Sequence, residues 1–142
     1  MPPSIIGSLR PEKATAGEKK VLKALRTALP NDFDVYVELP IDEQRHRGGE
    51  GGARRYPDFV VLANYGFVVV EVKDWVQIER ADRFGAHIRT RGNKVYKKHC
   101  PVEQAREYAL ILADKMKGLP ARLGEKGKLK VPYGSAVVLP NL

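Results

Sequence analysis

The sequence predicts a single domain of mixed α/β (α+β) class. Two segments with apolar residues at helical spacing, one toward each end of the chain, enclose several β-branched apolar runs separated by turn residues. The chain has 142 residues, of which 43% are hydrophobic, which is enough for one buried core without crosslinks. We therefore treat residues 1–142 as one domain. Its abrupt end, three residues after the last predicted strand, is what we expect of the N-terminal part of a longer multidomain protein.

The composition favours a cytoplasmic protein without a membrane segment. Cys100 is the only cysteine, so a disulfide within the chain is excluded, which suits a reducing compartment. No apolar run approaches the ~20 residues of a membrane span, and the N-terminus lacks the charged start and apolar stretch of a signal peptide. We expect a soluble, cytoplasmic protein, and no pattern in the sequence indicates a subunit interface.

The charge favours a polyanionic partner such as nucleic acid. The chain carries 25 basic and 17 acidic residues, for a net charge of +8. Part of this charge brackets the glycine-rich stretch GGEGG at residues 48–52, just before Asp58. The bracketing basic residues are Arg45, His46, Arg47, Arg54 and Arg55. We interpret the segment from Pro40 to Pro57, which contains this stretch, as an active-site flap, a DNA-tracking loop or a disordered insertion. The competing interpretation of the net charge is a solvated basic face with no nucleic-acid partner.

The first elements follow from periodicity. A helix is predicted over residues 15–29, where Val21, Leu22 and Leu25 recur at helical spacing and Pro30 ends the pattern. Thr15 with Glu18 fits a capping box, in which Glu18 reaches back to the Thr15 amide. Residues 35–39 are predicted as a short strand and residues 40–57 as a loop.

The centre of the chain predicts a hairpin. Residues 59–63 and 67–73 are apolar runs separated by Asn64-Tyr65-Gly66, in which glycine supplies the permissive backbone of a turn. Three more exposed strands are predicted at residues 76–79, 87–90 and 94–98.

A second helix is predicted to begin at Pro101 and to end at Gly118. Its predicted apolar face consists of Val102, Ala105, Tyr108, Ala109, Leu112 and Met116. A basic connection over residues 118–131 leads to a last strand at residues 135–139.

The hairpin brings three charges together. With Asn64 and Tyr65 as the loop, paired residue numbers sum to 129, so Asp58 lies opposite Glu71, with Cβ atoms ~4.5 to 5.5 Å apart. Two carboxylates this close repel each other unless one is protonated or a divalent cation such as Mg²⁺ lies between them. Lys73 emerges on the same face as Glu71, because alternate strand residues share a face.

This combination has the components of a metal-dependent phosphodiesterase. An ammonium beside the cation site can hold a water or stabilise charge developing on a phosphate. The competing interpretation is structural: Glu71 and Lys73 form a solvated ion pair on the sheet, and Asp58 is an ordinary strand-entry residue after Pro57.

At these residues the chain resembles a known family. Pro57-Asp58, twelve intervening residues and then Glu71-Val72-Lys73 resemble the core of the PD-(D/E)XK nuclease superfamily. Gly17-Glu18 in the first helix, Tyr65-Gly66-Phe67 leading into Glu71, and Gln104-Ala105 in a later helix are similar to the nuclease-related domain (NERD) family over roughly residues 14–140. The resemblance implies a restriction-endonuclease-like αβββαβ core, with a mixed sheet flanked by helices.

The resemblance also implies roles. Asp58 and Glu71 would bind Mg²⁺ or Mn²⁺, with the Val72 backbone carbonyl as a third ligand, and Lys73 would position or deprotonate the attacking water. Glu18 and Gln104 would face the same site. The implied activity is hydrolysis of phosphodiester bonds in DNA, as in an endonuclease, and RNA is not excluded. Family members are often fused to helicase or kinase modules, so a fused or partner helicase is expected.

The alternatives for the remaining residues stay open. Trp75 either stacks on a base or closes a buried strand. Gln104 and Tyr108, one helical turn apart, either face the site or are a solvated residue and a core residue. For the whole domain, the alternative to a nuclease is a catalytically silent module that binds nucleic acid for a partner motor.

Overall fold

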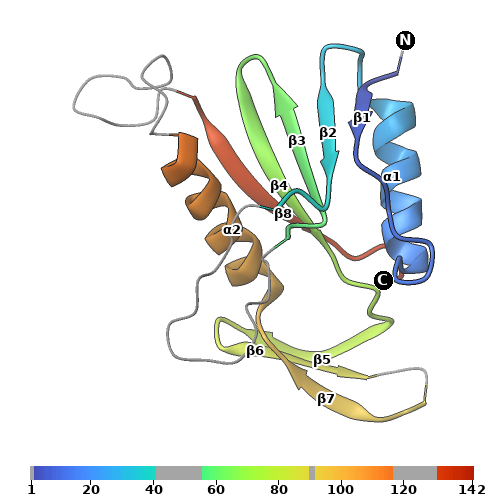
Figure 1. Ribbon diagram of the computed structural model, residues 1–142. Coiled ribbons are helices and arrows are strands. Elements are labelled where there is room, and N and C mark those ends of the chain that lie inside the picture. The colour runs from blue at the N-terminus through green and yellow to red at the C-terminus, as the bar shows by residue number, and fades with distance from the viewer. Residues whose placement is uncertain (1, 41–55, 90–91, 117–130) are drawn as a thin grey trace.

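The computed structural model describes residues 2–40, 56–89, 92–116 and 131–142, and shows two sheets and two helices (Figure 1). The elements, in chain order, are β1 (Ser4–Ile6), α1 (Ala16–Ala28), β2 (Asp34–Val37), β3 (Phe59–Ala63), β4 (Gly66–Val72), β5 (Gln77–Asp82), β6 (Gly85–Arg89), β7 (Val95–Lys98), α2 (Pro101–Met116) and β8 (Tyr133–Val138). None of the helices in these described ranges is long and apolar enough to cross a membrane.

The larger sheet is mixed and has the strand order β1-β2-β3-β4-β8. The outer pairs β1·β2 and β4·β8 are parallel, whereas β2·β3 and β3·β4 are antiparallel. The order α1-β2-β3-β4-α2-β8 confirms the predicted αβββαβ core. Two additions surround it: β1, which was not predicted, and the three-stranded sheet β5-β6-β7 between β4 and α2.

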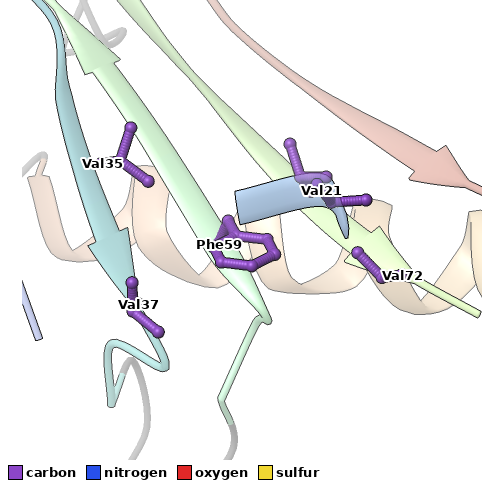
Figure 2. Close-up of a cluster of buried hydrophobic side chains, with 6 residues drawn as sticks. Val21, Val35, Val37, Phe59 and Val72 are labelled. Carbon is purple, nitrogen blue, oxygen red and sulfur yellow. The ribbon is translucent and has the colours of Figure 1, made fainter. Parts of the chain in front are cut away.

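The two helices cover opposite faces of this sheet. On one face, α1 supplies Val21 to a cluster that contains Val35, Phe59 and Val72 (Figure 2). On the other face, α2 supplies Ala109 and Ala113 to a cluster with Val60, Phe67 and Val69. Successive β4 residues therefore contact different helices, which is why this strand is a nearly continuous apolar run.

The central hairpin has the predicted register. Phe59 pairs with Val70 and Ala63 with Gly66, so Asn64 and Tyr65 form a two-residue loop. The preceding strand β2 ends at Val37, two residues earlier than predicted. Glu38 follows with a φ of 51°, a left-handed conformation that cannot continue a strand.

The buried stripe of α2 differs from the predicted one. Pro101, Ala105, Ala109 and Ala113 are buried at intervals of four residues, whereas Val102 is 58% exposed. Val102 was wrongly assigned to the apolar face, because it lies one position, or about 100°, away from this stripe. The small alanine side chains let α2 pack closely on β4 and β8. The predicted helix end at Gly118 lies outside the described residues.

The second sheet is a small antiparallel meander, β5-β6-β7, near the C-terminal end of β4 (Figure 1). It confirms the three strands predicted beyond Trp75, although β5 begins and ends later than expected. Ala86 and Ile88 of β6 are buried, whereas every residue of β7 is exposed. One face of the meander is therefore turned toward the body of the domain.

Candidate functional site

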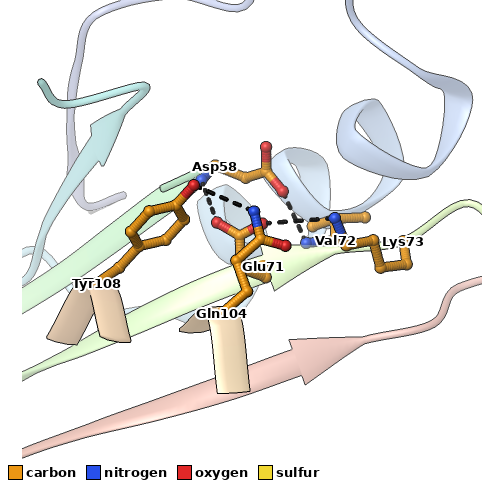
Figure 3. A network of polar contacts seen from close by, with 6 residues as sticks. All are labelled: Asp58, Glu71, Val72, Lys73, Gln104 and Tyr108. Atoms are coloured by element: carbon orange, nitrogen blue, oxygen red, sulfur yellow. Dashed lines mark hydrogen bonds and ion pairs between the residues drawn. The ribbon is translucent and has the colours of Figure 1, made fainter. Parts of the chain in front are cut away.

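Asp58 and Glu71 lie side by side where β3 begins and β4 ends (Figure 3). The register that pairs Phe59 with Val70 makes them the next opposed pair. The Asp58 backbone N–H donates to Glu71 Oε1 at 3.2 Å, and the Val72 N–H donates to Asp58 Oδ2 at 2.8 Å. Each carboxyl group is thus held by the backbone of the opposite strand, and the pair is fixed in place before any ligand binds.

Burial makes this pair electrostatically unusual. Glu71 is 3% exposed and is the one charged residue in the described ranges that is fully buried. Burial, and then the negative charge of Asp58, raises the pKa of Glu71 to about 8. Burial also raises the pKa of Asp58, although the Val72 N–H and Lys73 oppose this. The two carboxyl groups share a hydrogen bond that favours the protonated form of Glu71. These causes favour a proton on Glu71, which reduces the repulsion between the two carboxyl groups.

Lys73 joins the two acids as the alternation of the strand predicts. Its Nζ lies 3.9 Å from Glu71 Oε2, and its backbone N–H donates to the Val138 carbonyl at 3.0 Å. The lysine side chain is 26% exposed, against 4% for Glu71. The Lys73 side chain therefore extends from Glu71 toward solvent. Because Glu71 is buried, the two residues do not form the fully solvated ion pair that the structural interpretation of the sequence required.

The donor set fits a hard divalent cation. Among the described residues, no group of three His, Cys, Asp or Glu side chains has metal-binding geometry. The site instead offers two carboxylates and one backbone carbonyl. Because the Val72 N–H points toward Asp58, the carbonyl of the same extended residue lies along the same strand edge. Mg²⁺ is commonly bound by one or two carboxylates while it keeps several waters, so this small set is sufficient for it.

Glu18 reaches the site from the first turn of α1. Its backbone N–H donates to Thr15 Oγ1 at 3.1 Å, which confirms Thr15 as the N-cap. Burial and the nearby charge of Asp58 raise the pKa of Glu18, whereas hydrogen bonds with Thr15 lower it. Glu18 thus belongs to the helix cap and also lies within electrostatic range of Asp58.

Gln104 and Tyr108 approach the site from α2 (Figure 3). The Gln104 Nε2 amide donates to the Tyr108 hydroxyl at 3.1 Å, and the Tyr108 ring packs against the core cluster of this face. Gln104 also lines the cleft that contains Asp58. The structure therefore places Gln104 beside the carboxylate pair, with Tyr108 holding its amide.

An open cleft of about 690 Å³ lies over these residues. Its lining includes all five predicted catalytic residues, Asp58, Glu71, Lys73, Glu18 and Gln104. Trp75 also lines the cleft. Of the predicted nucleic-acid-binding residues, Arg45, Arg47, Arg54 and Arg55 lie outside the described residues.

The small sheet supplies three cleft residues that the sequence argument did not assign. Ile88 and Arg89 of β6 and Lys98 of β7 line the cleft that contains the carboxylates. The three lysines and the strand-favouring Val95 and Tyr96 of the segment KVYKK were a usable signal for a basic strand. Where that strand packs, however, depends on long-range contacts.

The end of β4 is supported by the chain's last residues. Asp74 accepts a hydrogen bond from the Asn141 side-chain amide, whose oxygen in turn accepts one from Lys20 Nζ at 3.3 Å. Gly17 makes room for this arrangement: a Cβ there would lie 2.8 Å from Pro140 Cγ and 2.9 Å from Asp74 Oδ1. Glycine at this position is explained by close packing beside the site.

Comparisons with known proteins identify a family. The model of the nuclease-related domain family matches residues 13–140, which is nearly the whole chain. No curated protein matches the sequence, and no solved structure matches it. The extent of the family match identifies the chain as a member of the nuclease-related domain family.

Proposed function

We propose that this domain is a Mg²⁺- or Mn²⁺-dependent nuclease that hydrolyses phosphodiester bonds in DNA by the PD-(D/E)XK mechanism. The observation that carries the proposal is the Asp58–Glu71 pair, in which Glu71 is buried and Asp58 half-buried, held by backbone hydrogen bonds in an open cleft with Lys73 beside it. A buried carboxyl group beside a second one costs stability, and perturbed ionisation in a cleft is typical of functional sites. The family match is consistent with this assignment.

The cation would be held by Asp58, Glu71 and the backbone carbonyl of Val72. When bound, it would supply Lewis-acid stabilisation of the negative charge that develops during phosphodiester hydrolysis. Because Glu71 is protonated in the metal-free protein near neutral pH, it must lose its proton before it can act as a ligand. Glu18 adds negative charge to the same region and so favours a cation there.

Lys73 is assigned to the attacking water and the phosphate. Its ammonium can donate one hydrogen bond to a water and another to a non-bridging phosphate oxygen, which orients the water for in-line attack. The new P–O bond forms from water, the bond to the leaving oxygen breaks, and the products are a phosphate monoester and an alcohol. Gln104 donates its amide N–H to Tyr108, and its amide oxygen would orient the same water.

The test is cleavage of plasmid and single-stranded DNA in Mg²⁺ or Mn²⁺, with EDTA as the negative control. Asp58→Asn, Glu71→Gln and Lys73→Met should each lose cleavage by at least about 100-fold, the usual order for a group that acts in the transition state. Lys23→Ala, a charge removal on the exposed part of α1, is the matched control and should cut like wild type.

Two outcomes would overturn the proposal. Cleavage that survives Asp58→Asn would assign the activity to a contaminant or to another site. A folded wild-type protein that binds DNA with steep salt dependence but never cuts it would instead support the silent nucleic-acid-binding module. An RNA substrate in parallel reactions decides whether the activity is restricted to DNA.

A further inference from the structure

The cleft has a second wall, which belongs to the small sheet. Ile88, Arg89 and Lys98 of this sheet line the same cleft as Asp58 and Glu71 of the larger sheet. This sheet is an addition to the αβββαβ core, and it contributes lining residues to the cleft. The question is which of its cations is available to a ligand.

Arg89 is already engaged. Its Nε donates to Glu79 Oε1 at 2.5 Å, and its Nη1 donates to Asn93 at both Oδ1 (2.9 Å) and the backbone carbonyl (3.3 Å). These bonds tie β5 and β6 to the segment that enters β7. Arg89 is therefore a structural residue of the wall, and most of its donors are not available to a ligand.

Lys98 is held differently. It pairs with Ala86, and Ile88 pairs with Tyr96, so Lys98 and Tyr96 lie on the face that Ile88 turns toward the cleft. The Lys98 Nζ lies 5.7 Å from the centre of the Tyr96 ring, within cation–π range. Within the described part of the chain, no carboxylate lies within 4.0 Å of this ammonium. Lys98 is thus a positioned cation that has no acidic partner among the residues that the structure describes.

The acidic residues of the cleft suggest a role for this cation in binding phosphate. Asp58 and Glu18 place carboxyl groups in the cleft, and their negative charge opposes the approach of a phosphodiester that lacks compensating charge. A nucleic-acid strand that reaches Asp58 must place neighbouring phosphates along the cleft, and lysine binds phosphate as a point charge without requiring one geometry.

We propose that Lys98 binds the DNA backbone at a phosphate flanking the scissile one, with Tyr96 holding its ammonium in place. This inference rests on the proposed function for the identity of the substrate, but it concerns binding and not the chemical step. The small sheet is then the substrate-binding wall of the domain.

The chain contains a matched control. Lys97 is the neighbouring residue, carries the same charge and pairs with His87, and it points to the opposite face of β7. Lys97→Ala and Lys98→Ala therefore change the net charge equally and differ only in which face of the sheet loses a cation.

The experiment is fluorescence anisotropy of a labelled single-stranded DNA, in EDTA and again in Mg²⁺, over a series of salt concentrations. Lys98→Ala should weaken binding about fivefold and reduce the slope of log affinity against log salt by roughly 0.7, the value for one phosphate contact on a single strand. Lys97→Ala should change affinity by less than about twofold, and Lys98→Arg should bind like wild type. Thermal melts of all variants establish that they are folded.

Equal weakening by the two lysine variants would overturn the proposal, as would a wild-type protein that does not bind the strand. If binding depends on Lys98 but the protein cuts no DNA, the proposal that Lys98 binds DNA is supported and the proposed nuclease activity is refuted. If cleavage depends on Asp58 but Lys98→Ala and Lys97→Ala bind DNA equally well, the nuclease activity is supported and the proposed role of Lys98 is refuted. Where cleavage occurs, Lys98→Ala should raise KM and leave kcat unchanged.

Discussion

Replacing Glu71 by glutamine should make the metal-free domain more stable at alkaline pH. In the wild type the pKa of Glu71 rises from 4.5 in the unfolded chain to about 8 in the fold. A raised carboxyl pKa means that the folded state binds the proton more tightly than the unfolded chain does. Proton binding by Glu71 therefore stabilises the folded state fully below pH 4.5, and this contribution is lost as the pH rises to 8. The glutamine amide can still accept from the Asp58 N–H and donate to its carboxylate, but it does not ionise.

The structure sets the size of this effect. One pKa unit corresponds to ~1.4 kcal/mol. Between pH 5 and pH 7.5 the free energy of unfolding of the wild type should therefore fall by on the order of 3 kcal/mol relative to that of Glu71→Gln. That is a large share of the ~5 to 15 kcal/mol that stabilises a typical domain, and it corresponds to a relative shift in Tm of about 10 °C.

The assay is urea unfolding of both proteins in EDTA at a series of pH values. Other titrating groups are common to the two proteins, so the difference between their free energies of unfolding isolates Glu71. A difference that stays constant from pH 5 to pH 8 would refute the assignment of the buried proton to Glu71. Adding Mg²⁺ at pH 8 should stabilise the wild type and have much less effect on the variant.

Three further predictions concern the surroundings of the site. Gly17→Ala should destabilise the domain by about 1 kcal/mol, because overpacking against Pro140 exceeds the ~1 kcal/mol gain in helix propensity. Gly134→Ala, where an added Cβ meets nothing within 4 Å, is the control and should be neutral in the same urea titration. Phe59→Ala should cost about 3 to 5 kcal/mol because the ring is fully buried, and a loss below about 1 kcal/mol by chemical denaturation would contradict this. Finally, Mg²⁺ binding at pH 7 should release close to one proton from Glu71, and far less at pH 9. Calorimetry in buffers of different ionisation enthalpy measures the number, and zero release at pH 7 would contradict the prediction.

The sequence predicted the part of the site that local rules determine. A two-residue turn and the strict alternation of strand side chains fix the register, so the opposition of Asp58 and Glu71 and the placement of Lys73 followed by counting. The helix cap at Thr15 followed in the same way, from a motif only four residues long.

What the sequence could not predict depends on packing between distant segments. The strand β1 is three residues long and pairs with β2 across α1, so it has no local signature. Val102 fits an apolar helical face by spacing, and only the position of α2 on the sheet shows that the buried stripe is Ala105, Ala109 and Ala113. The small sheet was predicted as strands, but nothing local indicates that it forms a wall of the cleft.

The parallel pairing of β4 with β8 has a consequence for the order in which the domain is made. The hairpin that aligns Asp58 with Glu71 is complete once residue 72 has been synthesised, but the partner that holds the Lys73 amide is Val138. Folding during synthesis generally proceeds from the N-terminus at the pace of translation, ~5 to 20 residues per second. At this pace the synthesis of residues 73–138 takes several seconds, so the two segments that carry the acids are made well before the strand that covers the second edge of β4.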